Sequence, residues 1–390
     1  MSERHASLTV WESGFGWEPA ADVAYRDVHV EDAGPRTYAA SVWESPVVEI
    51  PFTATELIPS WNARTPAGTW LHVEGRIGDA SGWTPWVTFA RWAEDDPDGE
   101  SPVTRTTVRG QQLDAGHVSA DTWHAAPGRG LDRWQLRLTA LATEDAVQAA
   151  DGAPGGGVEV HLVAAVASRF AIAPDEPTSR PGAGAGHEVP VPTYSQRLHV
   201  DTFPHWDNGG QSWCSPTSTT MLLEHWASGP SAAEAAWVGH DVDPVVVHGV
   251  RRVFDRSYGG AGNWAFNTAY AATRGLRAYV TRLRDLTEAE AFVAAGVPLV
   301  VSVTFREEEL DGAGYGTSGH LLTIVGFTAE GDVVSNDPNS GRIASNDEVR
   351  RVYRRDQFER VWLGDDGGLT YVIHPHGVEL PAPPAEANWA

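Results

Sequence analysis

The 390-residue chain has one cysteine, two methionines and no lysine, so all 28 of its basic residues are arginines. A single cysteine excludes an internal disulfide framework. No apolar run approaches the roughly 18 residues that a transmembrane helix needs. The N-terminus lacks the basic start and apolar block of a secretory signal. The sequence therefore predicts a cytoplasmic protein without a membrane span, and it leaves a leaderless export route open.

The 52 acidic residues outnumber the 28 basic ones, which gives the chain a formal net charge of −24. The negative electrostatic field of such a chain repels nucleic acid and anionic lipid. We therefore expect no nucleic-acid partner. The hydrophobic share of 42% is that of an ordinary soluble protein, and the length allows two or three domains.

A stretch rich in proline and glycine divides the chain. Residues 171–188 contain little periodic apolar sequence, which is typical of an interdomain linker. We expect one domain at residues 1–170, a second at 189–378, and a Pro/Ala-rich tail at 379–390.

The first domain has the pattern of strands. Apolar and polar residues alternate with period two at 47–50, 70–77, 134–141 and 158–163, and Gly, Pro and Asp clusters separate these runs. Such short strands predict an all-β antiparallel sandwich. Ten of the 17 tryptophans lie here, and we expect most of them to fill its core. Exposed tryptophans would instead suggest a carbohydrate-binding platform.

The second domain mixes helices and strands. Helices are predicted at 217–227, 245–255, 264–273 and 288–295, the last one closed by Gly296. Continuous β-rich runs occupy 298–305 and 320–327, and turn residues at 329–331 precede a further strand at 332–336. This pattern predicts an α+β domain in which the last two strands form a hairpin.

The lone cysteine, Cys214, lies between a Gly-rich loop and a predicted helix. A helix N-terminus supplies unpaired N–H groups and partial positive charge, which favour a thiolate. The side chain of Gln211, three residues upstream, could bind an oxyanion. The alternative is a buried, unreactive thiol, which is common for a single cysteine.

A histidine and a carboxylate are expected to meet at one end of the hairpin. His320 opens one strand and Asp337 closes the other, so folding about the turn brings them together. Asp337 could then orient the ring, and the second ring nitrogen could face Cys214. Neighbouring residues of a strand point to opposite faces, so Asn336 and Asp337 cannot both reach the histidine. Asp337 is the first choice and Asn336 the alternative.

These motifs resemble those of a known family. The segment from about residue 189 to 377 is similar to the C39-like branch of the papain-type cysteine peptidases. The resemblance rests on the segment 191–196, Gln211-Ser-Trp-Cys-Ser-Pro-Thr-Ser218, Gly319-His320, and Asn336-Asp337-Pro338. It implies a papain-like fold with Cys214 as nucleophile, His320 as base, Asp337 as its orienting group and Gln211 as oxyanion donor.

The first domain also resembles a known module. Phe52…Trp61, the Gly82-Trp-Thr-Pro-Trp86 turn and the Asp-Asp-Pro-Asp loop at 95–98 are similar to a β-sandwich found ahead of bacterial amidase and peptidase domains. Its ligand is not implied, and a cell-wall component is one candidate. The acidic, Gly-rich segment 307–318 before His320 is interpreted as a solvated loop, or as a lid or rim of the site.

The sequence thus predicts a cysteine peptidase or amide hydrolase that acts on a peptide or peptide-like substrate. Trp213 and Gly319 are the candidate substrate-binding residues, although packing of Trp213 against the helix is equally compatible with the sequence, and no cofactor is expected. Two alternatives stay open: a thioester-forming acyl or peptidyl transferase, and a protein that binds cell-wall glycan or peptide and has a vestigial peptidase domain. Metal-competent side chains occur at His240, Asp241, Asp243, His374 and His376, but their spacing is not that of a metal site.

Overall fold

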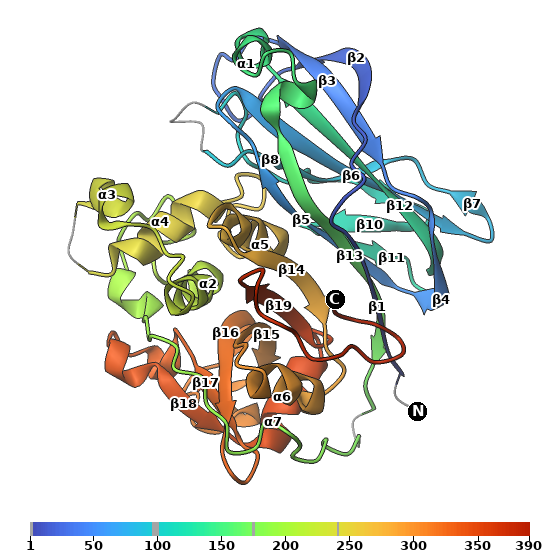
Figure 1. Cartoon of the computed structure of the whole chain (residues 1–390). Helices are drawn as coiled ribbons and strands as arrows, with labels where there is room; N and C mark the ends of the chain where they lie inside the picture. The colour runs from blue at the N-terminus through green and yellow to red at the C-terminus, as the bar shows by residue number, and fades with distance from the viewer. Residues whose placement is uncertain (1–2, 96–100, 174–175, 240–241) are drawn as a thin grey trace.

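Two sheets make up the N-terminal region, and a third sheet with helices makes up the C-terminal region (Figure 1). The structure is a computed structural model that describes residues 3–95, 101–173, 176–239 and 242–390. Most of the Asp-Asp-Pro-Asp loop at 95–98 and the pair His240–Asp241 lie outside the described residues. The predicted order, an all-β region followed by an α+β region, is confirmed.

The N-terminal region contains two antiparallel sheets. The strands of the first are β1 (Glu3–Trp11), β5 (Glu56–Arg64), β9 (Gln112–Leu113), β10 (Gly116–Ser119), β11 (Thr122–Ala125) and β13 (Glu159–Ala171). Those of the second are β2 (Glu18–Tyr25), β3 (Arg36–Glu44), β4 (Val48–Ala54), β6 (Thr69–Asp79), β7 (Gly82–Trp83), β8 (Val87–Trp92) and β12 (Leu131–Ala142). Their orders are β1-β13-β5-β11-β10-β9 and β2-β3-β12-β6-β7, with β4 on β12 and β8 on β6. A short helix, α1 (Glu144–Ala149), follows β12.

Tryptophan side chains fill much of the interior of this region. The prediction that most of them are buried is confirmed for six of the ten, namely Trp43, Trp61, Trp70, Trp92, Trp123 and Trp134. Trp83 is 37% exposed, and the guanidinium groups of Arg76 and Arg133 lie 4.8 and 5.1 Å from its ring centroid. These cation–π contacts occupy part of the aromatic surface that a sugar would need for stacking.

The C-terminal region forms one antiparallel sheet in the order β14-β19-β15-β16-β17-β18. Its strands are β14 (Arg277–Arg282), β15 (Leu299–Phe305), β16 (Thr317–Phe327), β17 (Val333–Asn336), β18 (Arg350–Tyr353) and β19 (Leu369–His374). Its helices are α2 (Cys214–His225), α3 (Ala232–Ala235), α4 (Pro244–Val253), α5 (Trp264–Thr273), α6 (Leu286–Ala294) and α7 (Arg355–Leu363). Among the residues that the structure describes, none of the helices is long and apolar enough to cross a membrane.

Most predicted elements of this region form close to their expected bounds. The helix predicted at 264–273 is α5, and Gly296 follows α6 with a φ of +78°. The predicted hairpin forms from β16 and β17, in which Thr323 lies opposite Asn336. Helix α2 begins three residues earlier than predicted, at Cys214, because Pro216 is tolerated within the first turn of a helix.

The two regions share one apolar core. The rings of Trp61 in β5 and Trp92 in β8 lie 6.2 and 5.3 Å from that of Phe266 in α5. The side-chain amide of Asn62 donates to the carbonyl of Ala278 at 2.6 Å and accepts from its N–H at 3.1 Å. These contacts join β5 and β8 to the C-terminal region, so the N-terminal region is firmly attached to it.

Polar contacts across the same junction hold the segment that leads into α5. Asp121, from the N-terminal region, accepts from the N–H groups of Trp264 and Ala265 at 2.6 and 3.1 Å. Asp255 is fully buried and accepts from the N–H and hydroxyl of Thr107 at 3.0 and 2.8 Å. The N-terminal region therefore fixes the path of residues 255–265.

The Pro/Gly-rich linker is bound along the C-terminal region. The carboxylate of Glu290 accepts from the N–H groups of Gly182 and Gly184 at 2.5 and 3.1 Å. The N–H of Ser179 donates to Glu359 at 2.8 Å. These bonds hold the described part of the linker in one path rather than leaving it as a flexible hinge.

The tail at 379–390 packs across both regions. Asn388 is fully buried, and its amide donates to the carbonyl of Arg282 and the carboxylate of Glu288 at 2.8 and 2.7 Å. The carbonyl of Ala387 accepts from the N–H of Leu8 in β1 at 2.9 Å. The tail thus connects the N-terminal strand to the third sheet.

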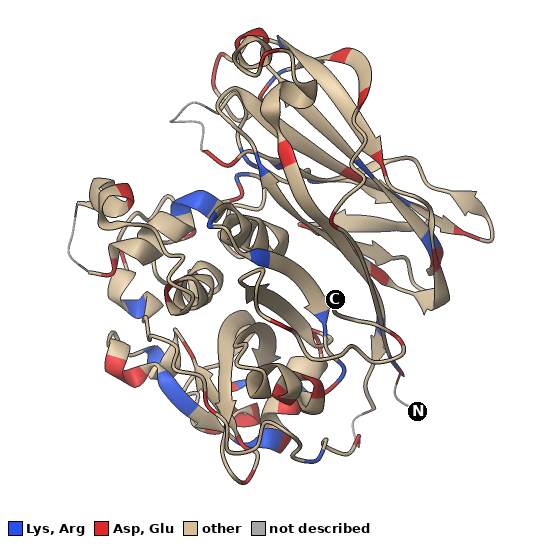
Figure 2. Cartoon of the chain, in the orientation of Figure 1, with Lys and Arg blue, Asp and Glu red and all other residues tan. Residues whose placement is uncertain are grey.

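An arginine-rich run follows β17, and Figure 2 shows its positive charge along β18 and the start of α7. Each of its four guanidinium groups contacts a carboxylate: Arg350 with Glu188, Arg351 with Glu348, Arg354 with Asp356 and Arg355 with Glu290. These pairs neutralise the run locally, so it does not offset the repulsion of polyanions that the net charge produces.

Candidate active site

Cys214 is the first residue of α2 and is half-buried. The loop before it folds back tightly, since the N–H of Gly210 donates to the carbonyl of His199 at 2.9 Å. A Cβ on Gly210 would lie 2.1 Å from the carbonyl oxygen of Gln196, so only glycine fits there. This loop places the thiol at the end of a helix whose first N–H groups have no intrahelical partners.

His320 lies near the start of β16 and is 3% exposed. Its Nε2 lies 2.8 Å from Oδ1 of Asp337, the residue that directly follows β17. Cys214 lies close enough for its charge to raise the pKa of the ring. Because Nε2 is bonded to Asp337, Nδ1 is the ring nitrogen left for the thiol. Helix α2 is held against β16 by a bond from the Ser218 hydroxyl to the carbonyl of Leu321, at 3.1 Å. The structure therefore brings Cys214, His320 and Asp337 close together.

The carboxylate of Asp337 is fully buried and accepts bonds on both oxygens. Oδ1 accepts from His320 and, at 2.9 Å, from the N–H of Asn339. Oδ2 accepts from the hydroxyl of Tyr353 at 2.7 Å and from that of Tyr315 at 2.9 Å; the Tyr315 hydroxyl also lies 3.1 Å from Oδ1. Burial alone would raise the pKa of Asp337, but the charge of His320 and these bonds hold that pKa below its usual range.

Two forces oppose each other at His320. Burial would lower the pKa of the imidazole, but the negative charges of Asp337 and Cys214, together with the hydrogen bond to Asp337, raise the pKa to about 10. The ring is therefore a cation at neutral pH. An imidazolium beside a sulfur atom stabilises the thiolate over the thiol.

Asn336, the alternative partner for the histidine, points elsewhere. Its amide donates to the carbonyls of Val191 and Pro192 at 3.4 and 3.1 Å, and its oxygen accepts from Arg350 at 2.5 Å. As strand alternation predicts, Asn336 and Asp337 face opposite sides. The described bonds of Asn336 fix the segment at 191–192 and do not include His320.

Two glutamines lie near the start of α2. The side chain of Gln211 is exposed. Gln196 is 1% exposed, and its Nε2 donates to the backbone carbonyl of Gln211 at 3.0 Å. Its Oε1 has no hydrogen-bond partner among the described residues. The sequence analysis did not select Gln196, although it closes the Val-Pro-Thr-Tyr-Ser-Gln segment that carried the family resemblance.

The two candidate substrate-binding residues differ in exposure. Trp213 is fully buried, and its indole N–H donates to the carbonyl of Trp206 at 2.6 Å. This burial favours the alternative in which Trp213 packs against the start of α2 over the one in which it lines a substrate cleft. Gly319 is exposed, and a Cβ there would meet no atom within 4 Å. Its backbone is therefore open to an approaching chain.

Sequence patterns also missed Tyr315 and Tyr353. Tyr315 belongs to the acidic segment interpreted as a solvated loop or rim. Glu307–Glu309 are indeed accessible there, but Leu310, Ala313 and Tyr315 are buried. An isolated aromatic residue in a Gly-rich stretch was the available signal for Tyr315. No sequence pattern pointed to Tyr353, at the end of β18.

Within the described residues, no group of three His, Cys, Asp or Glu side chains is arranged to hold a metal ion. His374 lies in β19 and is 2% exposed, and burial lowers its pKa to about 4. It therefore serves as a neutral core residue. His240 and Asp241 fall outside the described residues.

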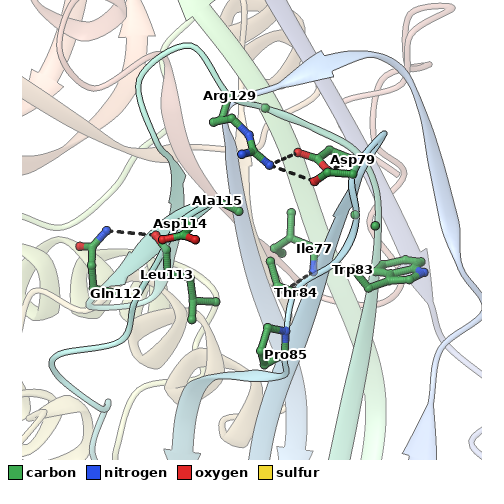
Figure 3. Close-up of a pocket in the computed structure, with 14 residues that line it drawn as sticks. Ile77, Asp79, Trp83, Thr84, Pro85, Gln112, Leu113, Asp114, Ala115 and Arg129 are labelled. Atoms are coloured by element: carbon green, nitrogen blue, oxygen red, sulfur yellow. Dashed lines mark hydrogen bonds and ion pairs between the residues drawn. The ribbon is translucent and has the colours of Figure 1, made fainter.

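A cavity of about 480 Å³ lies in the N-terminal region, apart from Cys214 (Figure 3). Arg129 and Asp79 form an ion pair on one side of it, and Gln112 and Asp114 lie on the opposite side. Trp83 contributes to its wall. The cavity combines carboxylates, a guanidinium, an amide and an aromatic edge, the groups that typically orient a polar ligand.

Comparison with known families covers most of the chain. Residues 8–168 match the Peptidase C39 N-terminal domain, and residues 188–367 match the Peptidase_C39 like family. A search of curated proteins gives no match. The two matched ranges coincide with the all-β region and the α+β region described above. The C-terminal region therefore belongs to the C39-like peptidase family, and the region ahead of it is a Peptidase C39 N-terminal domain.

Proposed function

We propose that the protein is a cysteine peptidase or amide hydrolase that acts on a peptide or peptide-like substrate. The observation that carries the proposal is the 2.8 Å hydrogen bond between His320 and Asp337, in a ring whose pKa is also raised by the charge of the neighbouring Cys214. A thiol, a base and a group that orients the base are the elements of nucleophilic acyl transfer. Family membership supports the same reaction class.

In the proposed mechanism, the Cys214 sulfur attacks the substrate carbonyl carbon as a thiolate. His320 holds the proton on Nδ1 and passes it to the leaving amine when the C–N bond breaks. Water then attacks the thioester, giving a proton to His320, and the C–S bond breaks to release the acid and restore the thiolate. Asp337 accepts from Nε2 throughout, so the ring keeps its orientation.

The oxyanion needs donors that are fixed before the reaction. The backbone N–H of Cys214, at the helix N-terminus, is one donor in the proposal. The sequence hypothesis gives the other as the side chain of Gln211. Burial favours Gln196, because a buried amide is preorganised and an exposed one is not. Its Nε2 carries two hydrogens, and one remains beyond the bond to Gln211.

The single cysteine makes the test simple, because any thiol-directed label reports on Cys214 alone. We expect the intact protein to be alkylated faster than a free thiol at pH below about 8, since an ordinary cysteine is mostly protonated there. The His320→Ala variant should lose this advantage, and Cys214→Ala should abolish peptide hydrolysis. Alkylation at the rate of a free thiol, unaffected by His320→Ala, would contradict the proposal.

Hydrolysis and transfer share the thioester and differ only in what attacks it. Mass spectrometry of the products, with and without an added amine or thiol acceptor, distinguishes them. We expect the free acid as the main product in both cases. A dominant adduct with the acceptor would instead identify a transferase.

A second candidate function concerns the cavity in the N-terminal region. Its polar walls are suited to a cell-wall glycan or peptide, and it would hold the protein near its substrate. The full-length Cys214→Ala protein should sediment with insoluble peptidoglycan, and Arg129→Ala should reduce the bound fraction. If the proteins with and without the Arg129→Ala change sediment equally, or if neither sediments, this role is refuted. Arg26→Ala, an exposed arginine outside the cavity, is the control.

A further inference from the structure

The buried carboxylate of Asp337 depends on two tyrosine hydroxyls that the mechanism above does not use. Asp337 and Tyr353 are fully buried, and Tyr315 is 2% exposed. Among the described residues, the donors to Oδ2 of Asp337 are the hydroxyls of Tyr353 and Tyr315. The His320 ring and the N–H of Asn339 bind Oδ1.

We propose that Tyr315 and Tyr353 are positioning residues, which keep Asp337 ionised and turned so that Oδ1 meets Nε2 of His320. The inference rests on the proposed cysteine-hydrolase function. It adds two residues that touch neither the nucleophile nor the base by hydrogen bond and act through the carboxylate.

The two hydroxyls reach the carboxylate from different elements. Tyr353 ends β18, an edge strand of the third sheet, and Tyr315 lies in the segment before β16. The ring of Tyr315 also lies edge-on to that of His320, with centroids 5.6 Å apart and an interplanar angle of 81°. Tyr315 therefore contacts both members of the pair, whereas Tyr353 contacts only Asp337.

The need for these donors follows from burial. A carboxylate without water must have its lone pairs satisfied by protein donors, or it takes up a proton. Without the two hydroxyls, Oδ2 would have no described donor, and the proton affinity of Asp337 would rise. A protonated Asp337 no longer balances the charge of the imidazolium, so the thiolate–imidazolium pair would be lost at a higher pH than in the intact protein.

The hydroxyls themselves stay protonated. Burial raises the pKa of Tyr315 and of Tyr353 well above the usual value, and the charge of Asp337 raises both further. Each group therefore remains a donor over the working range of the enzyme. The rim segment that precedes Gly319 is thus tied to the base through one permanent donor, Tyr315.

The test uses Tyr315→Phe, Tyr353→Phe and the double variant, in which the rings remain and the hydroxyls are lost. Two quantities are measured against pH: kcat/KM for a peptide substrate, and the rate at which iodoacetamide alkylates Cys214. We expect each single variant to lower kcat about 5–100-fold with little change in KM, since a buried acceptor loses one donor. The acid limb of both profiles should move to higher pH, and furthest in the double variant.

Tyr279→Phe is the matched control. Tyr279 is fully buried in β14, and its hydroxyl donates to the carbonyl of Ala390 at 3.1 Å. Loss of that bond can change stability, but the acid limb should stay in place. A shift of the limb in this variant would indicate a general effect of losing a buried hydroxyl.

The outcomes separate this inference from the function on which it rests. If alkylation of the intact protein depends on His320 and the tyrosine variants keep the original acid limb, the positioning role is refuted and the hydrolase proposal stands. If alkylation does not depend on His320, both the positioning role and the hydrolase proposal are refuted. Should the double variant not fold, the two single variants decide the matter.

Discussion

Replacement of Asp337 by asparagine perturbs the site where its hydrogen bonds converge. Asparagine keeps the shape of the side chain but loses the charge and can accept at only one of the two positions. The N–H of Asn339 cannot rotate away from Oδ1, whereas the hydroxyls of Tyr315 and Tyr353 can turn to accept from an amide. We therefore expect the amide oxygen to occupy the Oδ1 position and to keep its bond to His320.

In that orientation the hydrogen bond to His320 remains, but its acceptor is no longer a charged carboxylate. A bond to a charged group contributes roughly 1.5–3 kcal/mol, which corresponds to a decrease in kcat of about 10–150-fold. The opposite orientation would place the amide nitrogen against Nε2 and force the wrong tautomer. That error lowers kcat about 10⁴-fold in a Ser-His-Asp triad. A measured decrease in kcat of about 10–150-fold would support the orientation of the amide that Asn339 sets.

The pH profile gives a second, independent readout. Burial opposes the imidazolium, and the charge of Asp337 is the leading cause that raises the pKa of His320 to about 10. Without that charge the pKa falls, so the alkaline limb of kcat/KM should move to lower pH. The sign for stability agrees: the contribution of the raised pKa is fully present below the ordinary value of 6.5 and is lost as pH rises through about 10.

Two further variants complete the experiment. Asp347→Asn makes the same chemical change at an exposed carboxylate and should leave both kcat and the alkaline limb unchanged. Asn336→Ala removes the rejected partner and should affect stability through Arg350 rather than the pH profile. If Asp337→Asn kept kcat within about threefold of the intact protein, with an unmoved alkaline limb, the reasoning would be refuted.

Three other predictions concern the oxyanion donor and the junction. Gln196→Ala should lower kcat about 10²–10³-fold and Gln211→Ala much less; the reverse order in steady-state kinetics would return the role to Gln211. Asp121→Ala removes two bonds at the start of α5 and should lower the free energy of unfolding by about 1–2 kcal/mol in urea titrations, whereas the exposed Asp145→Ala in α1 should have a smaller effect. Deletion of residues 379–390 removes the buried Trp389 and Asn388 and should lower the midpoint of thermal unfolding; an unchanged midpoint would mean that the tail contributes nothing to stability.

The hairpin shows why part of the site was predictable from sequence. The turn residues at 329–331 fold β17 back onto β16, so hairpin geometry predicted that His320 and Asp337 lie near the same end. The structure adds a register shift between Ile324 and Gly326 that the sequence did not indicate. Likewise, strand alternation alone predicts that Asn336 and Asp337 point to opposite faces. The order of all-β and α+β regions was similarly encoded in the hydrophobic period.

The remainder of the site depends on contacts between residues distant in sequence. Tyr353 reaches Asp337 from another strand, and Gln196 reaches Gln211 only because the loop around Gly210 folds back. The sequence left two roles open for Trp213, because its position beside Cys214 does not reveal that the indole points inward, toward Trp206. Local patterns carry no information about such packing.

The shared junction has a consequence for recombining relatives of this protein. Asp121 and Thr107 lie in one region and their partners, the start of α5 and Asp255, lie in the other. A chimera that takes its N-terminal region from a relative would need these partners to match, or the segment at 255–265 would lose its anchors. We therefore expect the residues on the two sides of this junction to vary together among relatives.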